Sequence, residues 1–174
     1  MKVRPSLKLI VLRHAKSNWK ADYVHDHDRP LAPRGVRASR SMGVFLARVG
    51  SIPDLMLTSS AVRARATVEL ASEAGKWRAC PLHLTRSLYE ASASAALSQL
   101  RLLKTGPEIV LLSGHEPCCS ELVGELIGHA EILMPTATAA RIDLSIKSWE
   151  EIAPGLGTLR WLVTPKLLQL GAPD

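Results

Sequence analysis

Near its start the chain reads Leu7-Lys8-Leu9-Ile10-Val11-Leu12-Arg13-His14-Ala15-Lys16-Ser17. The first part is apolar apart from one lysine, and the run breaks into polar residues at Arg13. A short apolar run that ends so abruptly is typical of a buried β-strand followed by a loop. Arg13 and His14 would then lie at the carboxyl end of the strand, which is where open α/β sheets bind their ligands.

A second strand followed by polar residues is predicted at Asp54–Thr58. Ser59 and Ser60 come directly after it and offer an N-cap for a helix that runs to about Ala74. This helix carries Arg63 near its start. The second strand therefore also delivers an arginine to its carboxyl end.

A third segment of the same kind lies in the second half of the chain. Ile109–Leu112 is fully apolar and predicts a strand, which is followed by Gly114-His115-Glu116-Pro117. If the three strands are parallel neighbours, two histidines and two arginines converge on one place. Guanidinium groups match phosphate oxygens, and helix N-termini add backbone N–H donors. The three segments together therefore predict a phosphoryl-binding site.

The rest of the chain completes an α/β pattern. Apolar residues at helical spacing predict further helices, and short apolar or alternating runs predict further strands. Helices are predicted in Gly35–Val49, in the segment that begins at Ala93 and ends before Gly106, and after Pro117. Strands are predicted at Leu82–Thr85, Ala139–Ile146 and Thr158–Val163. The polar segment Ala21–Pro33 is predicted to be a surface loop. The order of these elements predicts a three-layer sandwich with a mostly parallel central sheet and helices on both faces. The length of 174 residues favours one domain over 1–174.

The composition narrows the class of protein. The chain has 22 Lys and Arg against 16 Asp and Glu, a formal charge of +6. These basic residues are scattered and not interleaved with aromatic residues, so we expect no nucleic-acid partner. No apolar run approaches the roughly 20 residues that cross a membrane, so we expect no membrane partner. The three cysteines are odd in number and two are adjacent, which indicates a reducing compartment and a cytoplasmic protein.

The three polar segments resemble the motifs of the histidine phosphatase superfamily, also called the phosphoglycerate-mutase-like family. Arg13-His14-Ala15 is similar to its Arg-His-Gly signature, and Gly114–Pro117 to its G-H-x-P motif. The segment 59–67 resembles the motif S-P-x-x-R-A-x-x-T, with Ser60 in place of proline. Two further segments, 27–35 and 88–92, are most similar to the SixA-type phosphohistidine phosphatases. The resemblance runs from about Leu9 to Val163 and implies a phosphoglycerate-mutase-like fold.

The resemblance implies a two-step phosphoryl transfer. His14 would attack phosphorus as a neutral nucleophile and form a phosphohistidine that water then hydrolyses. Arg13, Arg63 and His115 would hold the phosphoryl oxygens and offset charge in the transition state. Neither a metal nor another cofactor is implied, because arginines take the place of the cation.

Two further residues are assigned roles by the same resemblance. Ser17 would add a hydroxyl contact to the phosphoryl group. Glu90 stands where other family members carry the acid that protonates the leaving group, although a glutamate before a helix can also serve only to complement the helix dipole. The demand for such an acid depends on the substrate, because imidazole, with a pKa of ~6.5 in its free form, leaves more easily than an alkoxide.

The spacing of the motifs bears on the substrate. Only about thirty residues separate Thr58 from Tyr89, and a helix takes up half of them, which leaves no room for the cap segments of larger family members. We therefore expect an uncapped, shallow site that admits phosphohistidine on a protein, such as a histidine-phosphotransfer domain. One alternative is a phosphatase of small phosphorylated metabolites, such as sugar phosphates or nucleotides. Another is a non-catalytic phosphate-binding regulatory module.

Three other features allow competing interpretations. His25-Asp26-His27-Asp28 could hold a metal ion, although a polar loop beside the phosphate pocket is the simpler interpretation. Cys118 and Cys119 lie at a predicted helix start, where a thiolate would be stabilised, but the C-x5-R pattern of cysteine phosphatases is missing. His83 and His129 have no motif context and are expected to be structural or surface residues.

Overall fold

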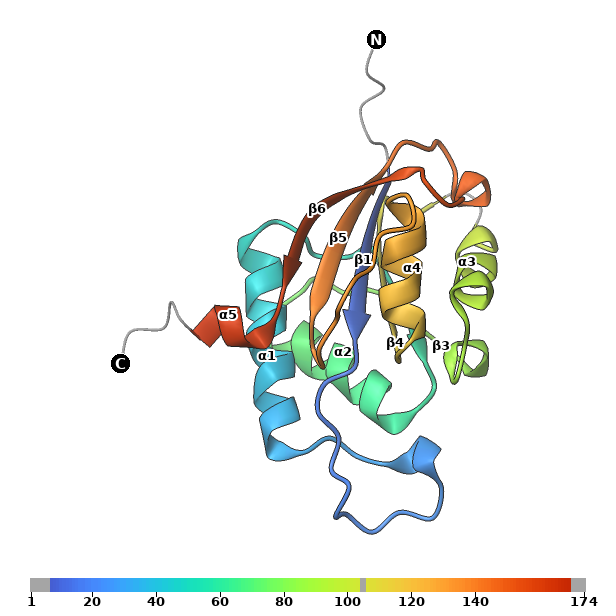
Figure 1. Cartoon of the computed structure of the whole chain (residues 1–174). Helices are drawn as coiled ribbons and strands as arrows, with labels where there is room; N and C mark the ends of the chain where they lie inside the picture. Colours follow the sequence, from blue (N-terminus) through green and yellow to red (C-terminus); the bar gives the residue numbers. More distant parts are fainter. Residues whose placement is uncertain (1–6, 104–105, 170–174) are drawn as a thin grey trace.

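The computed structural model describes residues 7–103 and 106–169. Its six strands form one sheet in the order β3-β2-β4-β1-β5-β6 (Figure 1). Four of them, β3, β2, β4 and β1, are parallel, and β5 and β6 run antiparallel to their neighbours. The strands are β1 (Leu7–Arg13), β2 (Leu55–Ser59), β3 (Leu82–Thr85), β4 (Ile109–Gly114), β5 (Ala139–Leu144) and β6 (Gly157–Val163).

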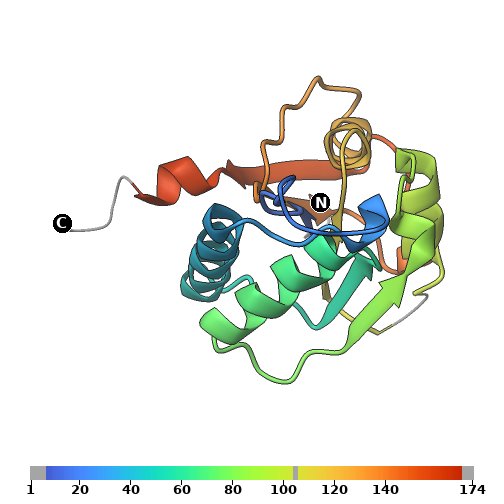
Figure 2. The same cartoon turned by 90° about the horizontal axis from the view of Figure 1, so that it is seen from below.

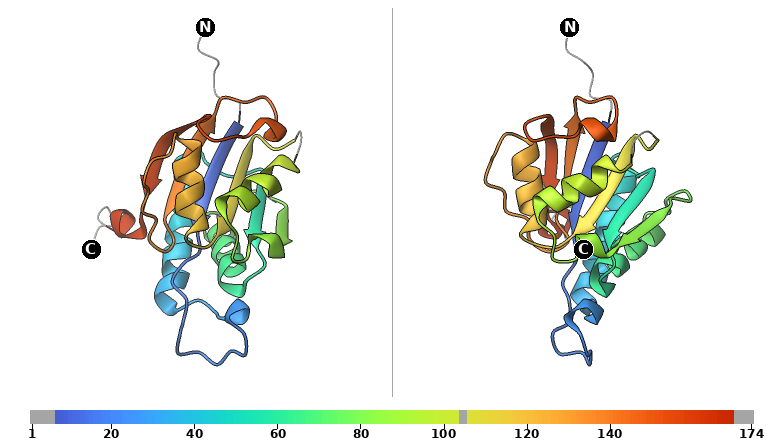
Figure 3. Two further views of the ribbon diagram at one scale, coloured as in Figure 1. Left: turned by 45° about the vertical axis from the view of Figure 1, so that its right-hand side comes forward. Right: turned by 90° about the vertical axis from the view of Figure 1, so that its right-hand side faces the viewer.

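Helices cover both faces of this sheet. The α-helices are α1 (Pro33–Arg48), α2 (Val62–Ala74), α3 (Ala93–Arg101), α4 (Cys118–Leu126) and the short α5 (Pro165–Gln169), and single 3₁₀ turns are η1 (Asp26–Asp28), η2 (Arg86–Leu88) and η3 (Trp149–Glu151). One face packs against α3 and α4, and the other against α1 and α2 (Figures 1 and 3). The predicted three-layer sandwich with a mostly parallel sheet is confirmed.

The central strand β1 shows why the first apolar run folds in this way. Its residues alternate between the two faces, so that Leu9 and Val11 contribute to the core beneath α3 and α4, while Ile10 and Leu12 contribute to the core beneath α1 and α2. All four side chains have no exposed surface. A strand buried on both faces needs a continuous apolar run rather than alternation with polar residues.

One predicted local feature is wrong. The helix cap expected at Ser59 and Ser60 is absent, because Ser59 is the last residue of β2 and helix α2 begins after Ala61. The surface loop expected over Ala21–Pro33 is confirmed, since all of its residues except Arg29 are exposed or half-buried. It contains the single turn η1, and Arg29 is buried with 5% of its surface exposed.

Gly35 holds the segment after β1 against helix α1. A Cβ atom on Gly35 would lie 2.2 Å from the carbonyl oxygen of Lys16, so a larger residue would push the two segments apart. The same carbonyl oxygen accepts a hydrogen bond from the backbone N–H of Ala32 at 2.8 Å. The chain that leaves β1 is therefore fixed against the start of α1.

Among the described residues, no helix combines the length and the apolar character needed to cross a membrane.

Candidate functional site

The three polar segments meet at the carboxyl edge of the parallel strands. Arg13 at the end of β1 is paired with Gly114 at the end of β4, and the backbone N–H of His14 donates to the Gly114 carbonyl at 3.0 Å. The rings of His14 and His115 lie 5.0 Å apart between centroids. This edge points toward the viewer in Figure 2, where the segment with η1 crosses in front of it. The predicted convergence of the strand ends is confirmed.

His14 is held as a neutral imidazole with a defined tautomer. Its Nδ1 lies 2.7 Å from the carbonyl oxygen of Ala15, and since a carbonyl can only accept, Nδ1 carries the proton. The other ring nitrogen, Nε2, therefore holds the lone pair. Burial, and then the charges of Arg63 and Arg13, lower the pKa of His14 to about 4 despite the opposing effect of the Ala15 carbonyl. At neutral pH His14 is uncharged and Nε2 is free to act as a nucleophile.

His115 is neutral for similar reasons. Burial first, and then the neighbouring His14 and Arg63, lower its pKa to about 3. Its Nε2 lies 2.9 Å from the hydroxyl of Ser59, the residue that was predicted to cap helix α2. Ser59 thus orients the second histidine instead of beginning a helix.

The site residues carry buried nitrogen atoms that have no hydrogen-bond partner. Arg13 donates through Nη1 to the carbonyl oxygen of Met134 at 2.8 Å. Six buried side-chain nitrogen or oxygen atoms of the described residues have no hydrogen-bond partner, and three of them are Arg13 Nε, Arg63 Nε and His115 Nδ1. Buried polar groups normally find a partner, so three such atoms on residues at one edge fit a site that takes up an anion.

Thr67 ties helix α2 to the chain after His14. Its hydroxyl donates to the Arg63 carbonyl at 2.6 Å and accepts from the backbone N–H of Ala15 at 3.0 Å. The first turn of α2, which carries Arg63, is thereby fixed relative to His14 and Ala15. A misplacement of a charged group by 1 Å is enough to weaken catalysis, so this link supports the geometry of the whole site.

Two residues of the polar loop over Ala21–Pro33, Asp26 and Arg29, lie in the same site; the sequence indicates a polar loop beside the phosphate pocket but no phosphoryl-binding role for either residue. The Asp26 carboxylate contacts Arg29 at 2.8 Å and Arg63 at 3.0 Å and accepts from the Tyr89 hydroxyl at 3.2 Å. Partial burial raises the pKa of Asp26, but Arg63 and Arg29 outweigh this and lower it overall. The Arg29 guanidinium stacks 3.5 Å from the centre of the Trp19 ring. The site therefore has a third arginine and an internal carboxylate.

Ser17 and Glu90 differ in how they relate to the other site residues. Ser17 is buried, and its hydroxyl accepts a hydrogen bond from Arg29. Glu90 is exposed and has a positive φ of 55°. Across residues 7–103 and 106–169 no hydrogen bond or ion pair involves its carboxylate. Ser17 is thus part of the site through Arg29, whereas Glu90 lies at its rim beside Tyr89.

The site is less open than the short motif spacing predicts. His14 has 8% and His115 has 7% of its surface exposed. The Tyr89 ring packs edge-on against His115, with 5.6 Å between centroids, and η1 brings Asp26 over the arginines. The cover comes from the segment after β1 and from the end of η2 rather than from an inserted subdomain.

The competing metal and thiol interpretations gain no support. Within the described parts of the chain, no three His, Cys, Asp or Glu side chains cluster in a way that could hold a metal ion. Burial, followed by Glu121, raises the pKa of Cys118 to about 12, and burial raises that of Cys119 well above its ordinary value. The expectation that a thiolate is stabilised at this helix start is wrong, because the helix buries both thiols. His83 and His129 are exposed, as expected.

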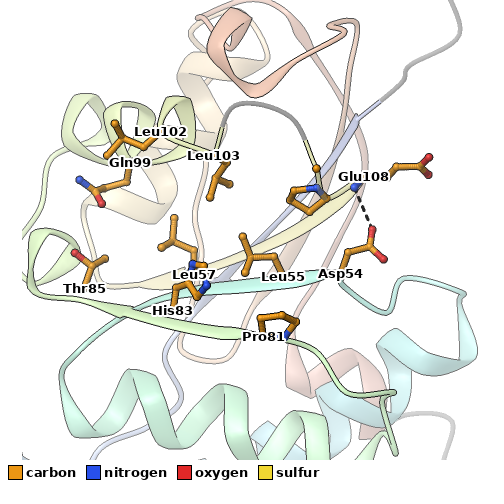
Figure 4. Close-up of a pocket in the computed structure, with 12 residues that line it drawn as sticks. Asp54, Leu55, Leu57, Pro81, His83, Thr85, Gln99, Leu102, Leu103 and Glu108 are labelled. Atoms are coloured by element: carbon orange, nitrogen blue, oxygen red, sulfur yellow. Dashed lines mark hydrogen bonds between the residues drawn. The ribbon is translucent and has the colours of Figure 1, made fainter.

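A pocket of about 910 Å³ lies apart from this edge (Figure 4). It opens between α3 and strands β2 and β3, and its lining includes Leu55, Leu57, His83 and Leu102. Asp54 at its border accepts from the backbone N–H of Glu108 at 3.1 Å. None of the converging arginines and histidines lines it, and no lining residue lies within two positions of them in the sequence, so the pocket is separate from the candidate site.

The internal carboxylate leads to a prediction for anion binding. We expect Asp26→Asn to bind inorganic phosphate about three- to tenfold more tightly, because it removes a negative charge that competes for Arg63 and Arg29. The Asp26 main-chain carbonyl, which accepts from Arg63 Nη1 at 2.7 Å, is retained and keeps that guanidinium in place. Titration calorimetry with phosphate measures the change. Asp22→Asn, an exposed change in the same segment, is the control, and weaker phosphate binding by Asp26→Asn would contradict the prediction.

The buried histidines also make stability depend on pH. The pKa of His115 is about 3 in the folded chain against an ordinary value of 6.5, so below pH 6.5 the unfolded chain takes up a proton that the folded chain refuses. The free energy of unfolding therefore decreases as pH falls through this window, by on the order of 1 kcal/mol per pH unit and histidine. We expect His115→Asn to lose less stability than wild type between pH 7 and 5 in urea titrations. The exposed change His83→Asn should behave like wild type, and an unchanged slope in His115→Asn would refute the argument.

Comparison with known proteins agrees with the geometry. The family description of the histidine phosphatase superfamily (branch 1) matches residues 9–101. An uncharacterized chloroplastic protein of Arabidopsis thaliana is 31% identical over 97% of this chain and 79% of its own length. An uncharacterized protein of Mycobacterium tuberculosis is 30% identical over 89% of this chain and 100% of its own.

Solved structures show the same architecture. The protein histidine phosphatase SixA complexed with tungstate superimposes with a TM-score of 0.79 at 25% identity and covers 93% of this chain and 99% of its own. The SixA protein of Nakamurella multipartitia superimposes with a TM-score of 0.80 at 23% identity, over 91% of this chain and 96% of its own, and so supports the fold. The chain therefore belongs to branch 1 of the histidine phosphatase superfamily and is a SixA-like phosphatase.

Proposed function

We propose that the chain removes the phosphoryl group from phosphohistidine in a protein, through a covalent intermediate on His14. One observation carries this proposal: the neutral His14, with its proton fixed on Nδ1, lies beside Arg13, Arg63 and His115, each of which has a buried nitrogen atom without a hydrogen-bond partner. The arrangement offers a lone pair for phosphorus and donors for its oxygens.

In the first step, Nε2 of His14 attacks phosphorus as the bond from phosphorus to the substrate imidazole breaks. The phosphoryl group moves to His14, whose Nδ1 proton stays in place, and the departing imidazole takes up a proton from solvent at the nitrogen that phosphorus leaves. In the second step, a water oxygen attacks phosphorus, the bond to Nε2 breaks, and inorganic phosphate leaves with neutral His14 restored. Arg13, Arg63 and His115 stabilise the charge on the phosphoryl oxygens, which is the main task in phosphoryl transfer. We propose that these arginines make a metal ion unnecessary.

The position of Glu90 supports phosphohistidine as the substrate. Glu90 is exposed at the rim of the site. Within the described residues, its carboxylate makes no hydrogen bond to His14. Imidazole is a good leaving group and requires little help from an acid, whereas an alkoxide requires a proton. A site with its acid at the rim therefore suits a nitrogen leaving group better than an oxygen leaving group.

A second candidate is hydrolysis of small phosphomonoesters. The burial of both histidines favours it, because a site with 8% and 7% exposure at His14 and His115 is easier to reach for a small molecule than for a side chain on a protein surface. In that case Tyr89 and the segment around Asp26 would serve as the cover that larger relatives build from inserted segments.

The deciding experiment compares phosphate release from a phosphohistidine-bearing protein with release from a panel of sugar phosphates and nucleotides. Each assay is run with and without EDTA, which tests the proposed independence from metal ions. Faster release from phosphohistidine supports the proposal. Release from esters alone assigns the chain to small metabolites, and release only when EDTA is omitted shows that a metal ion is required.

Glu90 provides a separate prediction about the leaving group. We expect Glu90→Gln to reduce kcat for a phosphomonoester by about 10²-fold, the size typical of general acid catalysis, and to change kcat for phosphohistidine less than threefold. Glu73→Gln, a change of the same kind on helix α2, is the matched control. Equal losses on both substrates would show that Glu90 acts on the structure of the site instead of on the leaving group.

A further inference from the structure

A second, basic pocket borders the site. It has a volume of about 710 Å³ and lies between the chain after β1, the start of α1, residues 135–136 and the start of α5. Four cationic residues line it, and no aspartate or glutamate does: Lys16, Arg34, Arg37 and Lys166. Helices α1 and α5 lie side by side at this corner of the molecule (Figures 1 and 2).

The walls of this pocket are the same segments that hold the catalytic residues. Lys16 follows His14 by two positions. On the opposite wall, Pro135 follows Met134, whose carbonyl accepts from Arg13. The backbone N–H of Ala137 lies 3.1 Å from the carbonyl oxygens of both Arg13 and His14. The pocket therefore shares its walls with the chain segments that lie next to Arg13 and His14.

The charge of this pocket is not neutralised by the protein. Asp26 compensates Arg63 and Arg29 in the catalytic site. In contrast, within residues 7–103 and 106–169 none of the four cations lining the pocket takes part in an ion pair. The amino end of α1, where Pro33 is the first residue, adds a partial positive charge. The local field therefore favours an anionic ligand.

We propose that this pocket binds carboxylate side chains of the phosphorylated substrate, on the segment that flanks the phosphohistidine. The four cations come from three separate parts of the chain. They surround a volume of about 710 Å³, which is a typical volume for a pocket that binds a small ligand. That arrangement suits several carboxylates better than one compact phosphate. The inference rests on the proposed function and adds a specificity for acidic sequences to it.

The test uses the full chain and two phosphohistidine peptides that differ only in flanking Asp and Glu against Asn and Gln. Wild type is expected to prefer the acidic peptide about tenfold in kcat/KM, mainly through KM. The double variant Arg34→Gln/Arg37→Gln should reduce this preference to about twofold, since each exposed ion pair contributes a few-fold. The double variant Arg40→Gln/Arg48→Gln removes the same charge from α1 outside the pocket and should keep the preference.

Equal hydrolysis of the two peptides by wild type would overturn the proposal. An equal loss of the preference for the acidic peptide in both double variants would also overturn it, because the preference would then depend only on net charge. Discrimination between a sugar bisphosphate and its monophosphate, without discrimination between the peptides, would assign the pocket to a second phosphate and also overturn it. If neither peptide is hydrolysed, the proposed function fails by itself. Fluorescence anisotropy with the unphosphorylated acidic peptide then still decides on the pocket, because only Arg34→Gln/Arg37→Gln should weaken its binding.

Discussion

Replacement of His14 by alanine is expected to lower phosphate release by at least about a thousandfold, the scale on which removal of a nucleophile acts. The reason is the tautomer of this residue. Its Nδ1 proton is committed to the Ala15 carbonyl, so Nε2 is the atom with a free lone pair. A water molecule cannot replace it, because water lacks both the fixed position beside Arg13 and Arg63 and the nucleophilicity of neutral imidazole.

The covalent step can be observed directly. Wild type mixed with a radiolabelled phosphohistidine protein and quenched within one turnover should carry the label on its own chain, and His14→Ala should not. The exposed change His83→Ala serves as the control and should carry the label like wild type. A label that persists in His14→Ala would place the nucleophile elsewhere and remove the basis of the proposed mechanism.

The strands and their meeting point could be predicted because the information is local. A strand buried on both faces must be apolar throughout, and such a run ends visibly where polar residues begin, as at Arg13 and after Leu112. Parallel strands then bring their carboxyl ends to one edge. Neither inference needs knowledge of distant contacts, and the contact between His14 and His115 confirms both.

The contribution of Arg29 and Asp26 could not be predicted in the same way. They lie in a polar segment without periodicity, and only tertiary contacts with Trp19, Arg63 and Tyr89 distinguish Arg29 and Asp26 from solvated loop residues. The segment 27–35, which contains Arg29, resembles the SixA-type phosphohistidine phosphatases, but this resemblance indicates no role for any of its side chains.

The errors at Ser59 and Cys118 have a common physical cause. Both residues were interpreted by their position near a helix start, where a hydroxyl caps and a thiolate is stabilised. In the structure β2 extends through Ser59, whose hydroxyl contacts His115. Cys118 faces the core, where burial keeps its thiol protonated. Tertiary burial thus overrides the local preference of a helix terminus.

The second large effect is expected for Arg63→Lys, which keeps the charge and removes the guanidinium. Arg63 donates through Nη1 to the Asp26 carbonyl at 2.7 Å and through Nη2 to the Asp26 carboxylate at 3.0 Å, and its buried Nε has no partner, so Nε is available to a phosphoryl oxygen. A lysine has one ammonium group, which cannot satisfy Asp26 from two sides and a phosphoryl oxygen at the same time. We expect kcat/KM to fall by about 10²- to 10³-fold, the loss typical of a missing donor to a developing charge.

The control for this change lies on the same helix. Arg65 is exposed and paired with Glu69 at 2.8 Å, so Arg65→Lys should change kcat/KM less than twofold. Arg63→Lys also disturbs the ion pair with the exposed Asp26, and thermal unfolding therefore has to show that both variants are folded at the assay temperature. If Arg63 acts on the transition state, the loss appears in kcat. If it only holds Asp26 and its segment in place, the Asp26→Asn variant should lose activity to the same degree, and the role of Arg63 in phosphoryl transfer would be refuted.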